Sequence, residues 1–171
     1  MASAVLTLEG ESVDPVSGIE RARVFVFLRT TCPIANRLAP EISRLAERYA
    51  TQGIDFWLVY VDPAESREEI ELHRAEYQLS PRIVRDSTHE LVERTGVRVT
   101  PDVAVLLEDG ELVYAGRIHD QYVKLGVTRV APRERDLELV LERIVAGERP
   151  SLRRTEGVGC WIEPLRTGGK K

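Results

Sequence analysis

The chain has little sulfur. It contains only two cysteines, Cys32 and Cys160, and a single methionine, Met1. Two thiols are too few for the disulfide framework of a small secreted scaffold and too few for a four-thiolate zinc site. Because the only methionine is Met1, no thioether is left inside the fold to act as a soft metal ligand. The cysteine content therefore indicates one reactive thiol with one distant partner thiol.

Other absences narrow the function further. No apolar run approaches the roughly 18 residues of a membrane span, so we expect no membrane-spanning segment. The formal charge of −4 argues against a nucleic-acid partner. The chain has neither a dinucleotide-binding loop nor a phosphate-binding loop, and we expect no cofactor. No basic-then-apolar signal follows Met1. We expect a cytoplasmic protein if Met1 is the native start and an exported one if a signal peptide has been removed.

Apolar runs between turn residues predict the strands. Four runs are long enough for sheet strands, and they cover residues 24–28, 54–61, 103–107 and 112–115. The first is continuously apolar, as expected of a strand buried on both faces, and the second is expected to be another central strand. The last two flank Asp109-Gly110, which is a strong hairpin signal. Shorter extended segments are expected at residues 4–9 and 83–84.

Helical spacing and capping residues predict four helices between these strands. The first follows Cys32 and ends near Gly53, and the second is a charged helix that Asp62 begins and caps and that reaches Tyr77. The third is opened by Ser87 and Glu90 in capping-box register and closed by Gly96. The last covers residues 137–145. Pro33 suits the first position of the first helix, and Pro40 should kink it.

This order predicts an α/β fold with a central mixed β-sheet flanked by helices. The length of 171 residues suits one domain with a sizeable core. We expect a domain over residues 1–147, followed by an extended C-terminal tail over residues 148–171 that carries Cys160.

Cys32 occupies the junction between the first long strand and the first helix. The first turn of a helix has unpaired N–H groups and the positive end of the helix dipole, and both favour a thiolate over a thiol. A cysteine there can be acidic, nucleophilic and partly exposed. Arg29 and Arg37 flank this helix start. We expect Arg29 to lower the pKa of Cys32 further and Arg37 to be a solvated surface residue.

Three local motifs resemble the thioredoxin-like superfamily over about residues 22–147. Cys32 is followed eight residues later by Pro40, a strand ends in aspartate at residues 59–62, and residues 96–113 place Thr100-Pro101 just before the hairpin. The resemblance implies that the Thr100–Pro101 bond is cis, that this proline faces the active cysteine, and that Thr100 and Pro101 bind an extended substrate.

The chain also departs from these families. Ala35 stands where thioredoxins have their second cysteine, and Val26 stands where they bury an aspartate. Peroxiredoxins have threonine or serine at the position of Arg29 and proline at that of Phe25. The nearest overall resemblance is to bacterial redoxin-domain proteins of the AhpC/TSA-like branch. It is carried by Cys-Pro-Ile-Ala-Asn-Arg at residues 32–37, Gly-Arg-Ile at residues 116–118, and Gly-Cys at residues 159–160.

Cys160 is the candidate resolving partner of Cys32. It lies thirteen positions after Gly147. When extended, this segment reaches up to about 45 Å, and a domain of this size is only about 40 Å across. Gly157 and Gly159 let the tail turn, and Trp161-Ile162 offers an apolar anchor. The alternative is an incidental cysteine on a flexible tail.

The three histidines fall into two groups, His119 expected near the candidate site and His73 and His89 expected on the surface. His119 follows the second hairpin strand, which returns to the end of the sheet near Pro101. It could accept a proton, complete a metal site with Cys32 and Cys160, or lie in water as a loop residue. His73 is on a charged helix and His89 is near a helix start, so both are expected on the surface.

These observations favour a thiol–disulfide oxidoreductase. Cys32 would attack a disulfide of a protein or small molecule, and Cys160 or an external thiol reductant would release the product. The alternatives are a peroxiredoxin-like thiol peroxidase that passes through sulfenic acid, and a copper-binding thioredoxin-fold chaperone that uses Cys32, Cys160 and His119. A binding module without turnover is a further possibility.

Overall fold

The computed structural model describes residues 3–166. Residues 1–2, which include Met1, and residues 167–171, at the end of the predicted tail, lie outside the described residues. The main sheet has six strands in the order β3-β2-β1-β5-β6-β9. Their bounds are β1 Ala22–Leu28, β2 Ile54–Tyr60, β3 Arg82–Arg85, β5 Val103–Leu107, β6 Leu112–Gly116 and β9 Arg153–Arg154. Because β1 pairs in parallel with β2 and antiparallel with β5, the sheet is mixed, as the sequence predicts.

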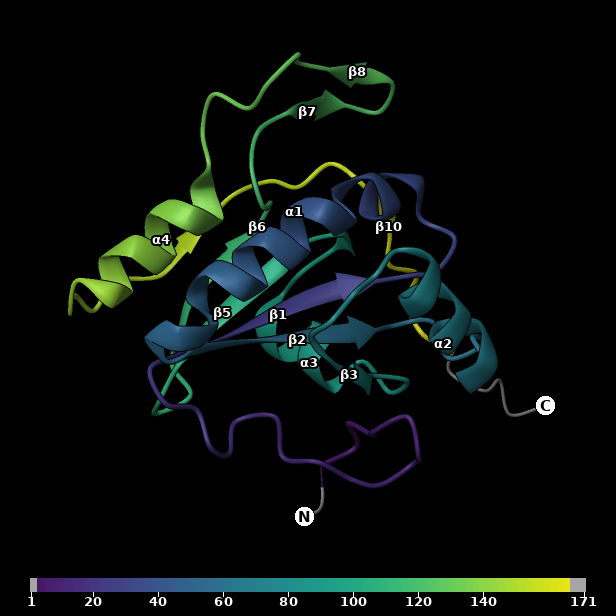
Figure 1. Ribbon diagram of the computed structural model, residues 1–171. Helices are drawn as coiled ribbons and strands as arrows, with labels where there is room; N and C mark the ends of the chain where they lie inside the picture. The colour runs from purple at the N-terminus through teal and green to yellow at the C-terminus, as the bar shows by residue number, and fades with distance from the viewer. Residues whose placement is uncertain (1–2, 167–171) are drawn as a thin grey trace.

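Helices cover the sheet (Figure 1). They are α1 Pro33–Tyr49, α2 Arg67–Glu76, α3 Glu90–Thr95 and α4 Asp136–Val145, with a 3₁₀ turn at Ala50–Gln52. Two small sheets complete the fold: β4 (Val99–Thr100) with β10 (Cys160–Trp161), and β7 (Tyr122–Lys124) with β8 (Val127–Thr128). The β7–β8 hairpin projects from the body in Figure 1. None of the described helices has the length and apolar character to cross a membrane.

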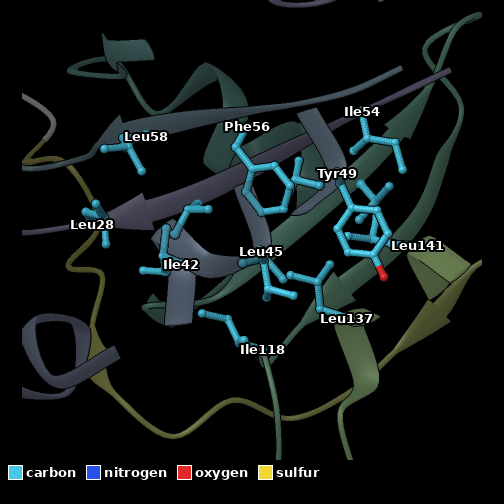
Figure 2. Packing of buried hydrophobic residues seen from close by; sticks show 14 of the residues in the cluster. Leu28, Ile42, Leu45, Tyr49, Ile54, Phe56, Leu58, Ile118, Leu137 and Leu141 are labelled. Atoms are coloured by element: carbon cyan, nitrogen blue, oxygen red, sulfur yellow. The ribbon is translucent and has the colours of Figure 1, made fainter. Parts of the chain in front are cut away.

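Successive residues of the central strands point to opposite faces of the sheet and build two cores. Val24 and Val26 belong to the core under α1 and α4, whereas Phe25 and Phe27 belong to the core on the other face, which Leu91 of α3 joins. Figure 2 shows the first core, where α1 and α4 side chains meet those of the sheet. Burial on both faces explains why β1 is apolar at almost every position.

The second helix begins later than the sequence predicts. It starts at Arg67, and Ser66 rather than Asp62 is its N-cap. The Ser66 hydroxyl accepts a hydrogen bond from the Glu69 N–H at 3.1 Å, and the Glu69 carboxylate accepts one from the Ser66 N–H at 2.7 Å. Asp62 instead accepts a bond from the Ala64 N–H within the loop.

The predicted capping box at Ser87 and Glu90 is wrong. The third helix begins only at Glu90, after His89 in a left-handed conformation. The buried carboxylate of Asp86 accepts bonds from the N–H groups of Leu91 and Val92, both at 3.0 Å. Glu90 accepts bonds from the N-terminal segment, at the Ala4 N–H and the Ser3 hydroxyl. The capping pattern matched in sequence, but the loop placed another carboxylate nearer to the helix end.

The N-terminal segment forms less strand than its alternation suggests. Leu6 makes isolated bridges to Ser12 and to Arg85 at the end of β3, and no strand is assigned over residues 4–9. Pro40 lies inside α1, which runs on to Tyr49. The predicted hairpin around Asp109-Gly110 is confirmed by the antiparallel pairing of β5 and β6.

The capping assignments lead to a stability test. Ser66→Ala should lower the free energy of unfolding by about 1 kcal/mol, because it removes the acceptor for the Glu69 N–H. Ser87→Ala is the matched control and should leave that free energy nearly unchanged. Urea unfolding of both variants makes the comparison, and a larger loss in Ser87→Ala would contradict the observed helix start.

Candidate functional site: two thiols on Thr100

Cys32 is the N-cap of α1, at the junction that the sequence predicts. Its backbone is extended, Pro33 follows at the first helical position, and the Cys32 carbonyl accepts the first helical bond from the Asn36 N–H at 3.0 Å. The Cys32 thiol donates a hydrogen bond to the Thr100 carbonyl oxygen at 3.3 Å. Cys32 is only 1% exposed, whereas a partly exposed thiol was expected. The sequence could not show what covers it.

The C-terminal tail brings Cys160 to the same place. Strand β10 pairs antiparallel with β4, so that Cys160 lies opposite Thr100, and the Ile162 N–H donates to the Arg98 carbonyl at 2.9 Å. The Thr100–Pro101 bond is cis, as predicted. Both thiols are free. Cys32, Thr100 and Cys160 therefore lie together in the structure. The sequence predicts all three as site residues, although they come from distant segments of the chain.

The two thiols differ in their readiness to ionise. Burial opposes ionisation of Cys32, but the neighbouring Cys160 thiol, the Thr100 side chain and the backbone N–H groups of Ala35 and Cys160 outweigh it, so the pKa of Cys32 is lowered. Burial, followed by the neighbouring Cys32 sulfur, raises the pKa of Cys160 to about 11. Within the pair, Cys32 is the thiol that ionises first, and Cys160 keeps its proton.

Arg29 acts on the other thiol. Its guanidinium bonds the Asp62 carboxylate at 2.8 Å, and its charge lowers the pKa of Cys160. The largest effects that lower the pKa of Cys32 come from its hydrogen-bond partners instead. Arg37 is exposed, as expected. The helix end and the tail, more than a neighbouring cation, make Cys32 acidic.

A chain of hydrogen bonds holds the loop before Cys32. The Thr30 N–H donates to the Glu65 carboxylate at 2.6 Å, and the Thr30 carbonyl accepts from the Asn36 amide at 3.1 Å. His73 contacts Asn36 at 2.7 Å and the Tyr60 hydroxyl at 2.8 Å. His73 is therefore buried, and the expectation of a surface residue is wrong, because one inward position of a charged helix faces the core.

His89 is also buried rather than on the surface. Its Nε2 lies 2.8 Å from the Val61 carbonyl oxygen, at the end of β2. Its backbone adopts a left-handed conformation with φ of 58°. The sequence placed it near a helix start, but the tight turn between Asp86 and α3 directs the imidazole inward.

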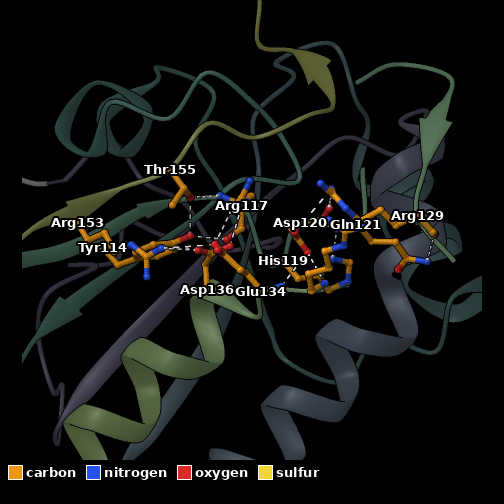
Figure 3. A network of polar contacts seen from close by, with 11 residues as sticks. Tyr114, Arg117, His119, Asp120, Gln121, Arg129, Glu134, Asp136, Arg153 and Thr155 are labelled. Atoms are coloured by element: carbon orange, nitrogen blue, oxygen red, sulfur yellow. Dashed lines mark hydrogen bonds and ion pairs between the residues drawn. The ribbon is translucent and has the colours of Figure 1, made fainter. Parts of the chain in front are cut away.

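His119 lies near the Pro101 loop. It lines a small pocket with Pro101, Asp102 and Val158, so it does reach the predicted end of the sheet. Its Nδ1 accepts a bond from the Gln121 N–H at 3.3 Å (Figure 3), and burial lowers its pKa. Over residues 3–166, no group of three or more His, Cys, Asp or Glu side chains could hold a metal ion. His119 is thus not assembled with the two cysteines as a ligand set for copper.

Asp102 is a site residue that the sequence reasoning missed. It follows the cis-proline directly and is only 5% exposed. Its backbone carbonyl accepts from the Phe27 N–H at 3.0 Å, and its carboxylate Oδ1 has no hydrogen-bond partner. Burial raises its pKa to about 7. The available signal was a carboxylate between an X–Pro bond and an apolar strand. The thioredoxin pattern instead places its buried aspartate at the position of Val26.

Polar contacts fasten the first part of the tail to the body (Figure 3). The fully buried Asp136 accepts bonds from Arg117 and from Arg153 of the tail, both at 2.7 Å. The Thr155 hydroxyl contacts the Tyr114 hydroxyl at 2.6 Å and accepts from the Arg117 N–H at 3.0 Å. Strand β9 therefore has a fixed position from which the tail continues to Cys160.

The buried Asp102 predicts a pH-dependent stability. Its folded pKa of about 7 exceeds an unfolded value of about 3.9, so the folded state binds more protons between these values and its stability falls as the pH rises from about 4 to 7. Asp102→Asn should remove a slope of up to about 1.4 kcal/mol per pH unit. Urea unfolding across this range measures it, and equal slopes in the two proteins would contradict the assignment.

The hydrogen bond between the two thiols leads to a prediction for the pKa of Cys32. Cys160→Ala should raise the pKa of Cys32, because it removes the thiol that stabilises the Cys32 thiolate. Cys160→Ser is the matched control: its hydroxyl can still donate, so the rise should be smaller. The pH dependence of Cys32 alkylation by iodoacetamide measures both, and an unchanged or lower pKa in Cys160→Ala would refute the interaction.

Comparisons with known proteins find both a sequence relative and similar structures. Over 128 residues the chain is 29% identical to the thiol-disulfide oxidoreductase ResA of Halalkalibacterium halodurans, covering 73% of this chain and 71% of that protein. An uncharacterized conserved protein of Geobacillus kaustophilus matches in structure with a TM-score of 0.82 and 20% identity, over 98% of this chain and 91% of that one. A secreted disulfide oxidoreductase of Mycobacterium tuberculosis matches with a TM-score of 0.57 and 20% identity, over 84% and 94% of the two chains.

These structural likenesses show a thioredoxin-like fold, as the sequence motifs predict. The family model described as Redoxin matches residues 3–123, which contain the strand–cysteine–helix junction and the cis-proline loop. The chain therefore belongs to the redoxin family.

Proposed function

We propose that the protein is a thiol–disulfide oxidoreductase with Cys32 as the attacking thiol and Cys160 as the resolving thiol. The observation that carries this proposal is the pairing of Cys160 with Thr100, which sets the second thiol against the acidic first one. The name of the ResA relative supports the same chemistry. The redoxin domain over residues 1–147 would supply the nucleophile, and the tail over residues 148–171 would supply the resolving group.

The reaction proceeds in two exchanges. The Cys32 thiolate attacks one sulfur of a substrate disulfide, forming a mixed disulfide and releasing the other sulfur as a thiolate that takes up a proton from water. Cys160 then loses its proton and attacks the Cys32 sulfur, which forms the Cys32–Cys160 disulfide and releases the second substrate thiol. The substrate gains two electrons and the protein loses two. An external thiol reductant returns both cysteines to the free state seen here.

The ionisation pattern suits this order of events. Cys32 carries the lowered pKa and attacks first, because the thiolate is the nucleophile. Once the Cys32 sulfur is held in a mixed disulfide, its negative charge no longer opposes ionisation of Cys160. Arg29 continues to favour the Cys160 thiolate at that stage. Thr100 and Pro101 would contact the substrate, since Thr100 already holds the Cys32 sulfur.

The test uses oxidised glutathione as the disulfide. The wild-type protein should give a linked Cys32–Cys160 peptide in a non-reduced peptide map. Cys160→Ser should instead accumulate glutathione on Cys32, because the resolving step is lost, and Cys32→Ser should reduce turnover to background. A protein in which Cys160→Ser turns over as fast as wild type would contradict the resolving role. Fast reaction with hydrogen peroxide but none with disulfides would indicate a thiol peroxidase.

A further inference from the structure

Near the end of the described residues, the tail forms a strand that pairs with the edge of β4. Residues 160–161 form β10 on the edge of β4, and the Ile162 N–H bonds to Arg98. Ile162 is only 6% exposed and belongs to the second core, so it anchors this strand. Trp161 is 56% exposed. Figure 1 shows β10 beside the start of α1, which is where Cys32 lies.

This strand fills the space that a reaction partner of Cys32 would need. A sulfur atom that exchanges with Cys32 has to reach its Sγ, yet Cys32 is 1% exposed and its thiol lies against Thr100 and Cys160. The backbone edge of β4 at Thr100 is already paired. An external partner can therefore react only after residues 157–161 leave.

Two glycines fit the tail to this edge. A Cβ on Gly159 would overlap the backbone carbonyl oxygen of Thr100, and a Cβ on Gly157 would overlap Oδ1 of Asp102. The backbone of the tail thus approaches the cis-proline loop more closely than any other residue type permits at these two positions. An occupant that takes the same path must also have glycine immediately before its cysteine.

The tail is fastened upstream of this strand. Thr155 donates its N–H to the Ala115 carbonyl at 3.1 Å and contacts Tyr114 through its hydroxyl, and Arg153 bonds the buried Asp136. Residues 157–162 can therefore separate from β4 while the preceding residues stay attached. Because release leaves the tail tethered nearby, rebinding is intramolecular and fast.

We propose that the tail strand of residues 157–161 gates Cys32: it occupies the edge of β4 at Thr100 and must be released before Cys32 can react, and an extended polypeptide that replaces it there needs a glycine immediately before its cysteine. That polypeptide would be the substrate of the function proposed above, and to that extent this inference rests on it. Gating by the tail concerns only whether a reagent can reach Cys32, so it can be tested without a disulfide substrate.

The first experiment measures that access without turnover. In a Cys160→Ser background, Cys32 is the only cysteine, and its alkylation by a bulky maleimide is followed by mass spectrometry. Ile162→Ala removes the anchor and should speed alkylation about tenfold or more, since it truncates the buried side chain that holds the strand in place. Glu163→Ala, at an exposed neighbouring position, is the matched control and should leave the rate unchanged.

Hydrogen exchange separates release of the tail from loss of the fold. In Ile162→Ala, the amides of residues 160 and 162 should exchange faster, whereas those of β1 should stay protected. Gly159→Ala is a second variant that loosens the strand from the Thr100 side. If either variant frees the tail amides but leaves the alkylation rate of Cys32 unchanged, the tail does not gate Cys32 and the proposal is wrong.

The second experiment tests the binding site itself. A synthetic peptide with the sequence of residues 155–163, carrying Cys160→Ser, is added to the Ile162→Ala protein in the Cys160→Ser background. It should slow alkylation of Cys32, and the same peptide with Gly159→Ala should not. Equal protection by both peptides, or by neither, would overturn the predicted requirement for glycine. These results do not depend on disulfide turnover, so a protein with a gated Cys32 but no oxidoreductase activity would refute only the proposed function.

Discussion

The site depends on the pairing of two short strands, β4 and β10. This pairing joins residues about sixty positions apart and places the thiol of Cys160 against that of Cys32, and Thr100 contacts both cysteines. Cys32 is buried there, so the segment that brings the second thiol also lies over the first. The register of this pairing, with Cys160 opposite Thr100 and Trp161 opposite Val99, sets where the Cys160 thiol lies.

The surroundings of that contact lower the pKa of one thiol and raise the pKa of the other. The helix end at Cys32 supplies N–H groups, and the tail supplies both a thiol and an N–H. Two thiols in contact do not ionise together readily, so the negative charge is favoured on the one with more hydrogen-bond donors. The loop before Cys32 is held by Glu65, Asn36 and His73, which limits the movement of the nucleophile. In the proposed mechanism, the displacement that the reaction requires is that of the tail.

Much of the fold could be predicted because its signals are local. Continuous apolar runs identified β1 and β2, Asp109-Gly110 identified the hairpin, and Pro33 after Cys32 identified the start of α1. The errors came where a pattern had more than one physical solution. Ser87 and Glu90 had capping-box spacing, yet the buried Asp86 carboxylate capped the helix. His73 and His89 looked like surface residues because their segments are polar, but each imidazole turned toward an inward hydrogen-bond partner.

The sequence by itself determined which chemistry was available: two thiols, one of them at a strand-to-helix junction, and a proline before the hairpin to face it. It also determined that the tail could approach closely, since Gly157 and Gly159 carry no Cβ. Only the tertiary structure decided that Cys32 is covered, that Asp102 is a buried carboxylate beside the proline, and that the tail binds as a strand. The physical reason is that burial and strand pairing depend on which distant segments meet, and no local pattern of residues records that.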